Sequence, residues 1–302
     1  MDIKYKESLS RGLGSPKVVG FYEPDTGSCQ YICIDEETRQ AALIDIVQEF
    51  DPASATTKYD HAQWALDYMQ QEKLELVWIL DTHPHADHLM AAAWLKEKTG
   101  KPMAIGEKVK EIAKLWRDIY HMPDAFDADR DFDRLFADGD TFKIGNLDVR
   151  VMLSPGHTLG SITYVIGDAI FAHDTFMQPD AGTARADFPG GSAAEVYDSL
   201  MAILDHPDDH RIFIGHDYGT KDRDEPAWER TVKEQRESNI HVGGGVPKED
   251  YVKRRDERDA TLGLPDRMLA ALQINLRGGR HPGTEADGHS YMKVPMNKFK
   301  DQ

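Results

Sequence analysis

"LELVWILDTHPHADHL", residues 74–89, joins an apolar run to three histidines and two aspartates. The run at residues 74–80 has the length and composition of a buried β-strand. A single buried histidine is usually a hydrogen-bonded core residue, but three histidines and an aspartate at residues 83–88 are difficult to satisfy by packing alone. We therefore predict a metal site at the end of a buried strand.

The spacing of these side chains favours a shared site. His83 and His85 are two residues apart, so in extended backbone they project to the same side. Asp87 and His88 follow as the chain turns into a helix, which the sequence predicts over residues 87–98.

Three further candidate ligands occupy similar positions later in the chain. His157 lies in a proline–glycine turn between two apolar runs, and Asp174 and His216 each follow an apolar run. The strands of a packed sheet can direct the loops at their ends toward one point. We expect these three residues to meet the first cluster there.

The hydrophobic pattern of the whole chain predicts a mixed α/β fold. Strands are expected over residues 18–23, 29–35, 41–46, 102–106, 141–145, 147–153, 161–167, 169–174 and 211–215, and helices over 59–71, 108–120 and 193–204. Two rounds of strands followed by helices suggest two sheets packed face to face with helices outside. From Pro226 onward the pattern is helical, over residues 227–238, 248–259 and 265–276. We predict a catalytic domain at residues 1–225 and a helical C-terminal extension at 226–302, packed on it.

The charge of the chain limits its partners. With 53 acidic against 36 basic residues, the net charge is −17. Such a surface repels nucleic acids and anionic membranes, so we expect neither as a partner. A small anionic substrate would need a few well-placed arginines. The sequence leaves a homo-oligomer open.

The cysteines and the absence of long apolar segments suggest a cytoplasmic protein. No stretch approaches the roughly 20 apolar residues of a membrane span, and the first ten residues contain no apolar signal segment. Cys29 and Cys33 lie four residues apart on one predicted strand, so we expect buried free thiols, which suit a reducing compartment.

The ordered set "HPHADH" (residues 83–88), His157, Asp174 and His216 resembles the metallo-β-lactamase superfamily. The resemblance covers nearly the whole chain and implies an αββα sandwich with the metal site at one edge of the two sheets.

The resemblance leaves two metal arrangements open. In one, His83, His85 and His157 hold one zinc, Asp87, His88 and His216 hold a second, and Asp174 bridges them. That arrangement suits hydrolysis by a metal-bound hydroxide, as in the thioester hydrolase glyoxalase II. In the other, His83, His157 and Asp174 form the two-histidine, one-carboxylate triad that holds a single Fe(II). The remaining four would then orient ligands and tune the metal.

The flanking sequence favours iron. The segment "TARADF" (residues 183–188), which follows Asp174, resembles the persulfide dioxygenase branch and the related bacterial β-lactamase-like hydrolases, as do "HDY" (216–218) and "INLRGG" (274–279). This resemblance implies one Fe(II) per chain and oxidation of glutathione persulfide by O₂ to sulfite and glutathione.

The same likeness suggests roles for three more residues. Arg185 and Arg277 would bind substrate, and Tyr218 would hydrogen-bond near the iron as a catalytic residue. Two positions depart from the family pattern: Ala186 stands where the family usually has threonine, and His173 where it commonly has glycine.

Two alternatives to the dioxygenase remain. One is a dinuclear zinc thioester hydrolase of the glyoxalase II type. The other is a redox-sensing or binding protein that uses the metal site without turnover.

Overall fold

Alternating apolar residues give the first strands of the fold two buried faces. The computed structural model describes residues 3–299. In β3 (Ser28–Asp35), Tyr31 and Cys33 belong to the core between the sheets, whereas Ile32 and Ile34 pack beneath the helices on the other side. A strand that is buried on both faces must lie inside a layered structure.

The first sheet has seven strands in the order β1-β2-β3-β4-β7-β9-β10. Besides β3 these are β1 (Tyr5–Ser8), β2 (Lys17–Glu23), β4 (Gln40–Ile44), β7 (Glu75–Leu80), β9 (Met103–Gly106) and β10 (Arg134–Phe136). The antiparallel run β2-β3-β4 confirms the expected strands near the start of the chain. From β4 onward the neighbours are parallel, so their carboxyl ends meet at one edge.

The second sheet has six strands in sequence order, β11 to β16. They are β11 (Thr141–Ile144), β12 (Leu147–Leu153), β13 (Ile162–Ile166), β14 (Ala169–His173), β15 (Arg211–Ile214) and β16 (Glu229–Thr231). Only β14 and β15 are parallel neighbours, and α5 lies between them in the chain. A third, small sheet contains β5 (Val47–Asp51), β6 (Thr56–Lys58) and β8 (Leu89–Met90).

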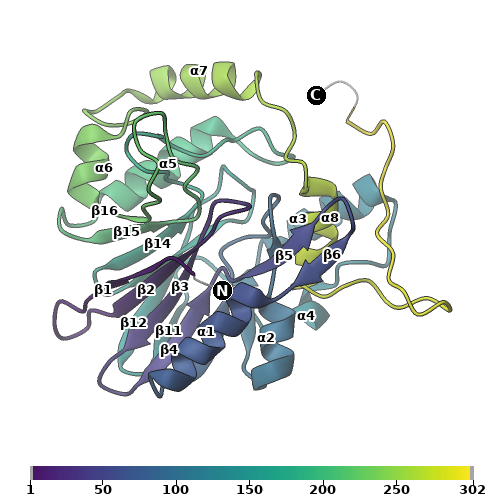
Figure 1. Ribbon diagram of the computed structural model, residues 1–302. Helices are drawn as coiled ribbons and strands as arrows, with labels where there is room; N and C mark the ends of the chain where they lie inside the picture. Colours follow the sequence, from purple (N-terminus) through teal and green to yellow (C-terminus); the bar gives the residue numbers. More distant parts are fainter. Residues whose placement is uncertain (1–2, 300–302) are drawn as a thin grey trace.

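Helices cover the outer sides of the two large sheets (Figure 1). They are α1 (Asp60–Gln71), α2 (Ala92–Thr99), α3 (Val109–Tyr120), α4 (Ala128–Asp131), α5 (Ala193–Leu204), α6 (Val232–Ser238), α7 (Lys248–Asp259) and α8 (Met268–Asn275). Residues of α1, α2 and α3 pack on the first sheet, and α5 packs on the second. The expected α/β sandwich with helical C-terminal elements is confirmed.

Three expected helices begin later than predicted, the one over residues 265–276 at Met268. The helix predicted over residues 87–98 begins only at Ala92, and the histidine-rich segment before it forms a loop and the short strand β8. The helix predicted over 227–238 begins at Val232, because Glu229–Thr231 pairs with β15 as an edge strand. The proposed division at residues 225 and 226 would therefore leave β16, a strand of the second sheet, in the extension.

The structure also bears on the two cysteines and on the expectation about membrane spans. Cys29 and Cys33 are both buried free thiols, as expected. None of the helices within residues 3–299 combines the length and the apolar character that crossing a membrane requires.

Candidate metal centre

The candidate ligands come from four loops at one edge of the sandwich. His83, His85, Asp87 and His88 follow β7, His157 lies between β12 and β13, Asp174 follows β14, and His216 follows β15. Backbone hydrogen bonds join the two sheets here: Cys29 N donates to Gly215 O at 2.8 Å, and Ile162 N donates to Thr82 O at 3.0 Å. The chain thus fixes both halves of the site to one rigid edge.

Asp174 lies between two imidazoles from different segments. Its Oδ2 is 3.5 Å from Nε2 of His83 and 3.5 Å from Nε2 of His157. The two rings are nearly perpendicular, with centroids 5.1 Å apart. The structure therefore brings the three predicted triad residues together, and their role as ligands stays a prediction.

Hydrogen bonds fix the tautomers of both rings. His157 Nδ1 donates to the carbonyl oxygen of Arg185 at 2.9 Å. The Thr82 hydroxyl donates to Asp45 Oδ2 at 2.9 Å, so His83 Nδ1, 3.0 Å from the same hydroxyl, is the donor to it. Each proton on Nδ1 leaves the lone pair on Nε2, which faces Asp174.

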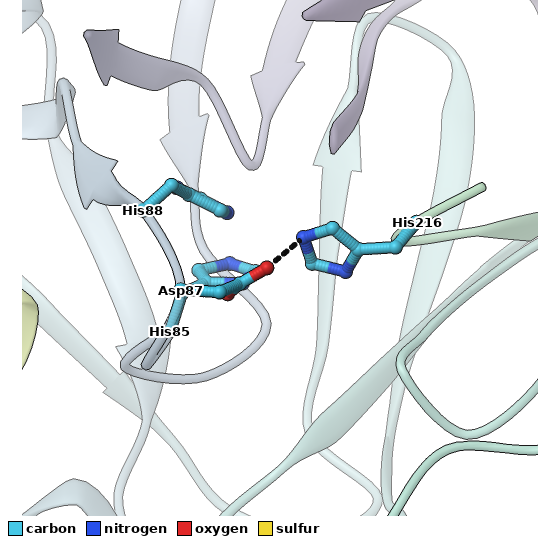
Figure 2. Close-up of side chains that lie close together, drawn as sticks. All are labelled: His85, Asp87, His88 and His216. Atoms are coloured by element: carbon cyan, nitrogen blue, oxygen red, sulfur yellow. Dashed lines mark ion pairs between the residues drawn. The ribbon is translucent and has the colours of Figure 1, made fainter. Parts of the chain in front are cut away.

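A second group of side chains surrounds His216 (Figure 2). The potential ligand atoms of His85, Asp87, His88 and His216 all lie within 4.8 Å of one another. His216 lies between two carboxylates, with Nε2 2.6 Å from Asp87 Oδ2 and Nδ1 2.6 Å from Asp174 Oδ1. Burial opposes a charge on this ring, but Asp174 and Asp87 raise the pKa of His216 well above its ordinary value.

The donor set fits a divalent transition metal. His83 Nε2 and His85 Nδ1 are buried and have no hydrogen-bond partner among the described residues. Burial lowers the pKa of His157 to about 4 and the pKa of His85 well below its ordinary value, so both are neutral at pH 7. Neutral imidazoles beside carboxylates are typical ligands of zinc and iron, and unsatisfied buried nitrogens are otherwise rare.

Asp45 supports this centre, and we did not predict it from the sequence. Its Oδ1 accepts from Thr82 N at 2.8 Å and lies 3.2 Å from His85 Nε2. A proton on His85 Nε2 leaves Nδ1 free to face the cluster. The signal in the sequence is an aspartate directly after the apolar strand β4, and its φ of +53° places it in the left-handed region.

Asn275 is the residue of "INLRGG" that reaches the site. Its Nδ2 donates to the carbonyl oxygens of His85 and His88 at 2.7 and 2.8 Å, and its Oδ1 accepts from Met90 N at 2.8 Å. The side chain is fully buried. We expected Arg277 of this motif to bind substrate, but its guanidinium lies over the Phe126 ring and not at the cavity.

A cavity of about 720 Å³ opens beside the metal centre. Tyr218 lines it, stacks on His216 with ring centroids 5.7 Å apart, and donates to Asp87 Oδ2 at 3.3 Å. Arg185 also lines it, but Nε and Nη2 of its guanidinium each donate to Asp187 at 2.6 Å. The predicted roles of Tyr218 and Arg185 stay predictions, and the guanidinium fork of Arg185 is already occupied.

The structure gives the contacts of Ala186 and His173, the two residues that depart from the family pattern. Ala186 is buried, and its backbone N–H donates to Asp259 Oδ2 at 2.8 Å. His173 has a φ of +40°, which glycine adopts without strain, and its Nε2 lies 3.0 Å from the hydroxyl of Ser154 and 3.1 Å from that of Thr175. The imidazole therefore has partners that a glycine would lack.

Comparison with known families gives one match over more than half of the chain. The model of the metallo-beta-lactamase superfamily matches residues 50–216. This range includes His83, His157, Asp174 and His216.

Three relatives and one solved structure cover most of the chain. It is 49% identical to a "Beta-lactamase hydrolase-like protein" of Xylella fastidiosa, over 96% of this chain and 67% of that one. It is 40% identical to "Glyoxylase B2" of Dictyostelium discoideum (94% and 98% covered) and 26% identical to human "Persulfide dioxygenase ETHE1, mitochondrial" (89% and 91% covered). The crystal structure of ETHE1 from Myxococcus xanthus has a TM-score of 0.69 at 26% identity, covering 86% of this chain and 98% of that one.

Proposed function

This chain belongs to the metallo-beta-lactamase superfamily, and within it we propose that the protein is a non-haem iron persulfide dioxygenase. Its reaction would convert glutathione persulfide, O₂ and water into glutathione, sulfite and two protons. The likeness to human persulfide dioxygenase and to the Myxococcus xanthus ETHE1 structure supports this proposal.

The two carboxylate oxygens of Asp174 face different partners, and this observation carries the proposal. His216 engages Oδ1 of this carboxylate at 2.6 Å, so only Oδ2 faces His83 and His157. One carboxylate oxygen and two imidazole lone pairs make the facial triad of non-haem iron enzymes. His216, between Asp87 and Asp174, compensates the remaining negative charge without a second metal.

The chain's own residues would orient and shield the reacting atoms. His83, His157 and Asp174 would hold Fe(II), which would bind a thiolate sulfur and O₂. The Arg185 carbonyl fixes the His157 ring, and Phe188 packs edge-on against that ring with centroids 5.3 Å apart. Apolar lining residues such as Met177 and Ala184 limit water around the sulfur.

Metal content and oxygen uptake test the proposal together. Protein purified without oxygen should contain about one iron per chain and should consume O₂ when glutathione persulfide is added. Iron-containing protein that takes up no O₂ with this substrate would leave only a sensing or binding role. Two zinc ions per chain and rapid thioester cleavage would contradict the dioxygenase.

The second candidate is a dinuclear zinc hydrolase of glutathione thioesters. It is favoured by the group His85, Asp87, His88 and His216, which could hold a second metal, and by the likeness to Glyoxylase B2. In this case His216 would release Asp87 and Asp174 to the metals. A zinc-loaded protein that cleaves a glutathione thioester without O₂ would support it.

The setting of the enzyme is also part of the proposal. The buried free thiols Cys29 and Cys33 suit a reducing compartment, and we propose a cytoplasmic protein. Size measurement in solution would decide between a monomer and a homo-oligomer.

A further inference from the structure

Both acidic and basic side chains line the large cavity. Asp87 and Asp174, beside the candidate metal centre, are among the acidic ones. Arg254, Arg255 and Arg258, all from α7, are among the basic ones. Met177, Ala184 and Ile240 are among the apolar side chains that also line it. These arginines give the cavity lining a local positive charge in a chain whose net charge is −17.

Two of the arginines that line the cavity have structural partners. Arg185 is paired with Asp187 at 2.6 Å. Arg255 is buried, pairs with Asp259 at 2.5 Å and donates to the Thr183 carbonyl at 3.1 Å. This pair attaches α7 to the segment that carries Ala186, because Asp259 also accepts from the Ala186 N–H.

Arg254 and Arg258 have no such partner. Both are exposed at the cavity, and within residues 3–299 neither has a carboxylate oxygen within 4.0 Å. Arg254 donates one bond to the Ile240 carbonyl and Arg258 one to the Thr261 hydroxyl, which leaves most of their five N–H donors free. They are four residues apart on α7, so the two like charges repel each other slightly, and a bound anion would relieve that repulsion.

A neutral donor lies beside these two cations. His241 Nδ1 accepts from the Thr183 N–H at 3.0 Å, so its Nε2 carries the proton. Burial, reinforced by the three arginines of α7, lowers the pKa of His241 to about 4, which keeps the ring neutral at pH 7. His241 therefore adds an N–H donor beside Arg254 and Arg258 without adding charge.

We propose that Arg254 and Arg258 form an anion subsite that binds a carboxylate of a small thiol carrier, with the carrier's sulfur at the metal centre. This inference rests on the proposed function, since it specifies which end of the substrate lies where. Arginine forks match carboxylates with paired hydrogen bonds. The cavity volume is in the range that buries a ligand of drug size, which suits a tripeptide thiol such as glutathione.

Calorimetry of the metal-loaded protein without oxygen tests the subsite with three probes, which are glutathione, glutathione diethyl ester and coenzyme A. Arg254→Gln and Arg258→Gln should each raise the Kd of glutathione about tenfold, since hydrogen bonds to charged groups are the strong ones. Glutathione diethyl ester, which has no free carboxylate, should bind wild type and variants equally. In turnover, the loss should fall on KM, with kcat within about twofold of wild type.

Lys253→Gln is the matched control. It removes one positive charge from the same helix at an exposed position that does not line the cavity, so glutathione binding should not change. Metal content and the midpoint of thermal unfolding should equal those of wild type in all variants.

Three results would overturn the subsite. The first is unchanged glutathione binding in a variant that carries both Arg254→Gln and Arg258→Gln. The second is an equal loss of affinity for the diethyl ester, and the third is arginine-dependent binding of coenzyme A that is tighter than that of glutathione. The third result would show that the two arginines bind phosphate and not a carboxylate. Because calorimetry needs no turnover, a protein that binds glutathione through both arginines but consumes no O₂ would contradict the dioxygenase and leave this subsite intact.

Discussion

His157 connects the metal centre to the cavity wall. Its Nδ1 donates to the Arg185 carbonyl, and its Nε2 faces Asp174. The same ring thus depends on the segment after β14 for its orientation. A side chain held in this way could bind a metal without first losing rotational freedom.

We predict that His157→Ala lowers metal affinity by more than about a hundredfold, because loss of a ligand should exceed the effect of losing an outer-shell partner. Metal content after dialysis against a weak chelator would measure this. His289→Ala, which changes an exposed histidine, is the control. Full metal retention in His157→Ala would remove this residue from the site.

His173 combines backbone strain with useful hydrogen bonds. A residue with a Cβ at a φ of +40° is strained, and glycine is not. His173→Ala loses the ring and keeps the strain, whereas His173→Gly loses both. We expect the alanine variant to be less stable than the glycine variant by about 1–2 kcal/mol, measured by urea unfolding of the metal-free proteins. Equal stabilities would show that the backbone is relaxed there.

At the scale of elements, helix α8 holds the histidine-rich loop in place. This loop has little regular structure, and Asn275 satisfies three of its backbone groups. A loop built this way depends on an element nearly 190 residues away in the chain. A local sequence pattern cannot predict a contact between segments so far apart in the chain.

Asn275→Ala should therefore cost both stability and metal affinity. Each buried backbone group that loses its partner costs about 1–3 kcal/mol, so we expect a loss of several kcal/mol in unfolding free energy. Chemical denaturation and metal titration would measure the two effects. Asn146→Ala, at an exposed turn, should change stability by less than about 0.5 kcal/mol. An Asn275→Ala protein with the stability of wild type would contradict this role.

The elements that we predicted correctly have strong local signals. The helices over 59–71, 108–120 and 193–204 and the strands around β2, β3, β7 and β12 match the structure within a residue or two. Among the strands that we did not predict, β1 and β5 have four and five residues, and β6, β8, β10 and β16 have only two or three. Segments that short contain no periodicity, so pairing with a neighbour decides their structure.

At the scale of the whole molecule, one buried arginine joins the N-terminal segment to the second sheet. Arg211, at the start of β15, is fully buried. It pairs with Asp168 at 2.7 Å and donates to the Ser8 hydroxyl at 2.8 Å and the Pro16 carbonyl at 2.9 Å. These bonds hold the edge of the first sheet against the second.

Asp168→Asn should destabilise the protein by about 3–5 kcal/mol, because Arg211 would keep a buried charge without its partner. Burial opposes ionisation of Asp168, but the bonds from Arg211 and Ser15 lower its pKa below the ordinary 3.8. The ionised carboxylate therefore stabilises the fold above that value, and this contribution is lost as the pH falls through the lowered pKa.

Unfolding at several pH values would check both points. The difference between wild type and Asp168→Asn should be constant from pH 7 to about pH 5 and should shrink below about pH 4. Asp148→Asn, at an exposed pair with Lys143, should have little effect at any pH. A difference that does not depend on pH would assign the effect of Asp168 to packing.

The fold class and the candidate ligands can be read from the sequence alone, because both depend on local information. Apolar periodicity specifies strands and helices, and the spacing in "HPHADH" specifies a group of metal-binding side chains. The superfamily follows from the order of these residues. No contact between distant segments is needed for any of these inferences.

Which side chains meet depends on the folded arrangement of the chain. The fold brings Asp45 and Asn275 to the candidate metal centre, places Arg254 and Arg258 at the cavity beside it, and leaves Arg277 outside both. Side chains of the same type are alike in a sequence, and their partners and burial differ only after the chain has folded. The physical reason is that hydrogen bonds and ion pairs depend on distances of a few ångströms between segments that packing, not chain proximity, brings together.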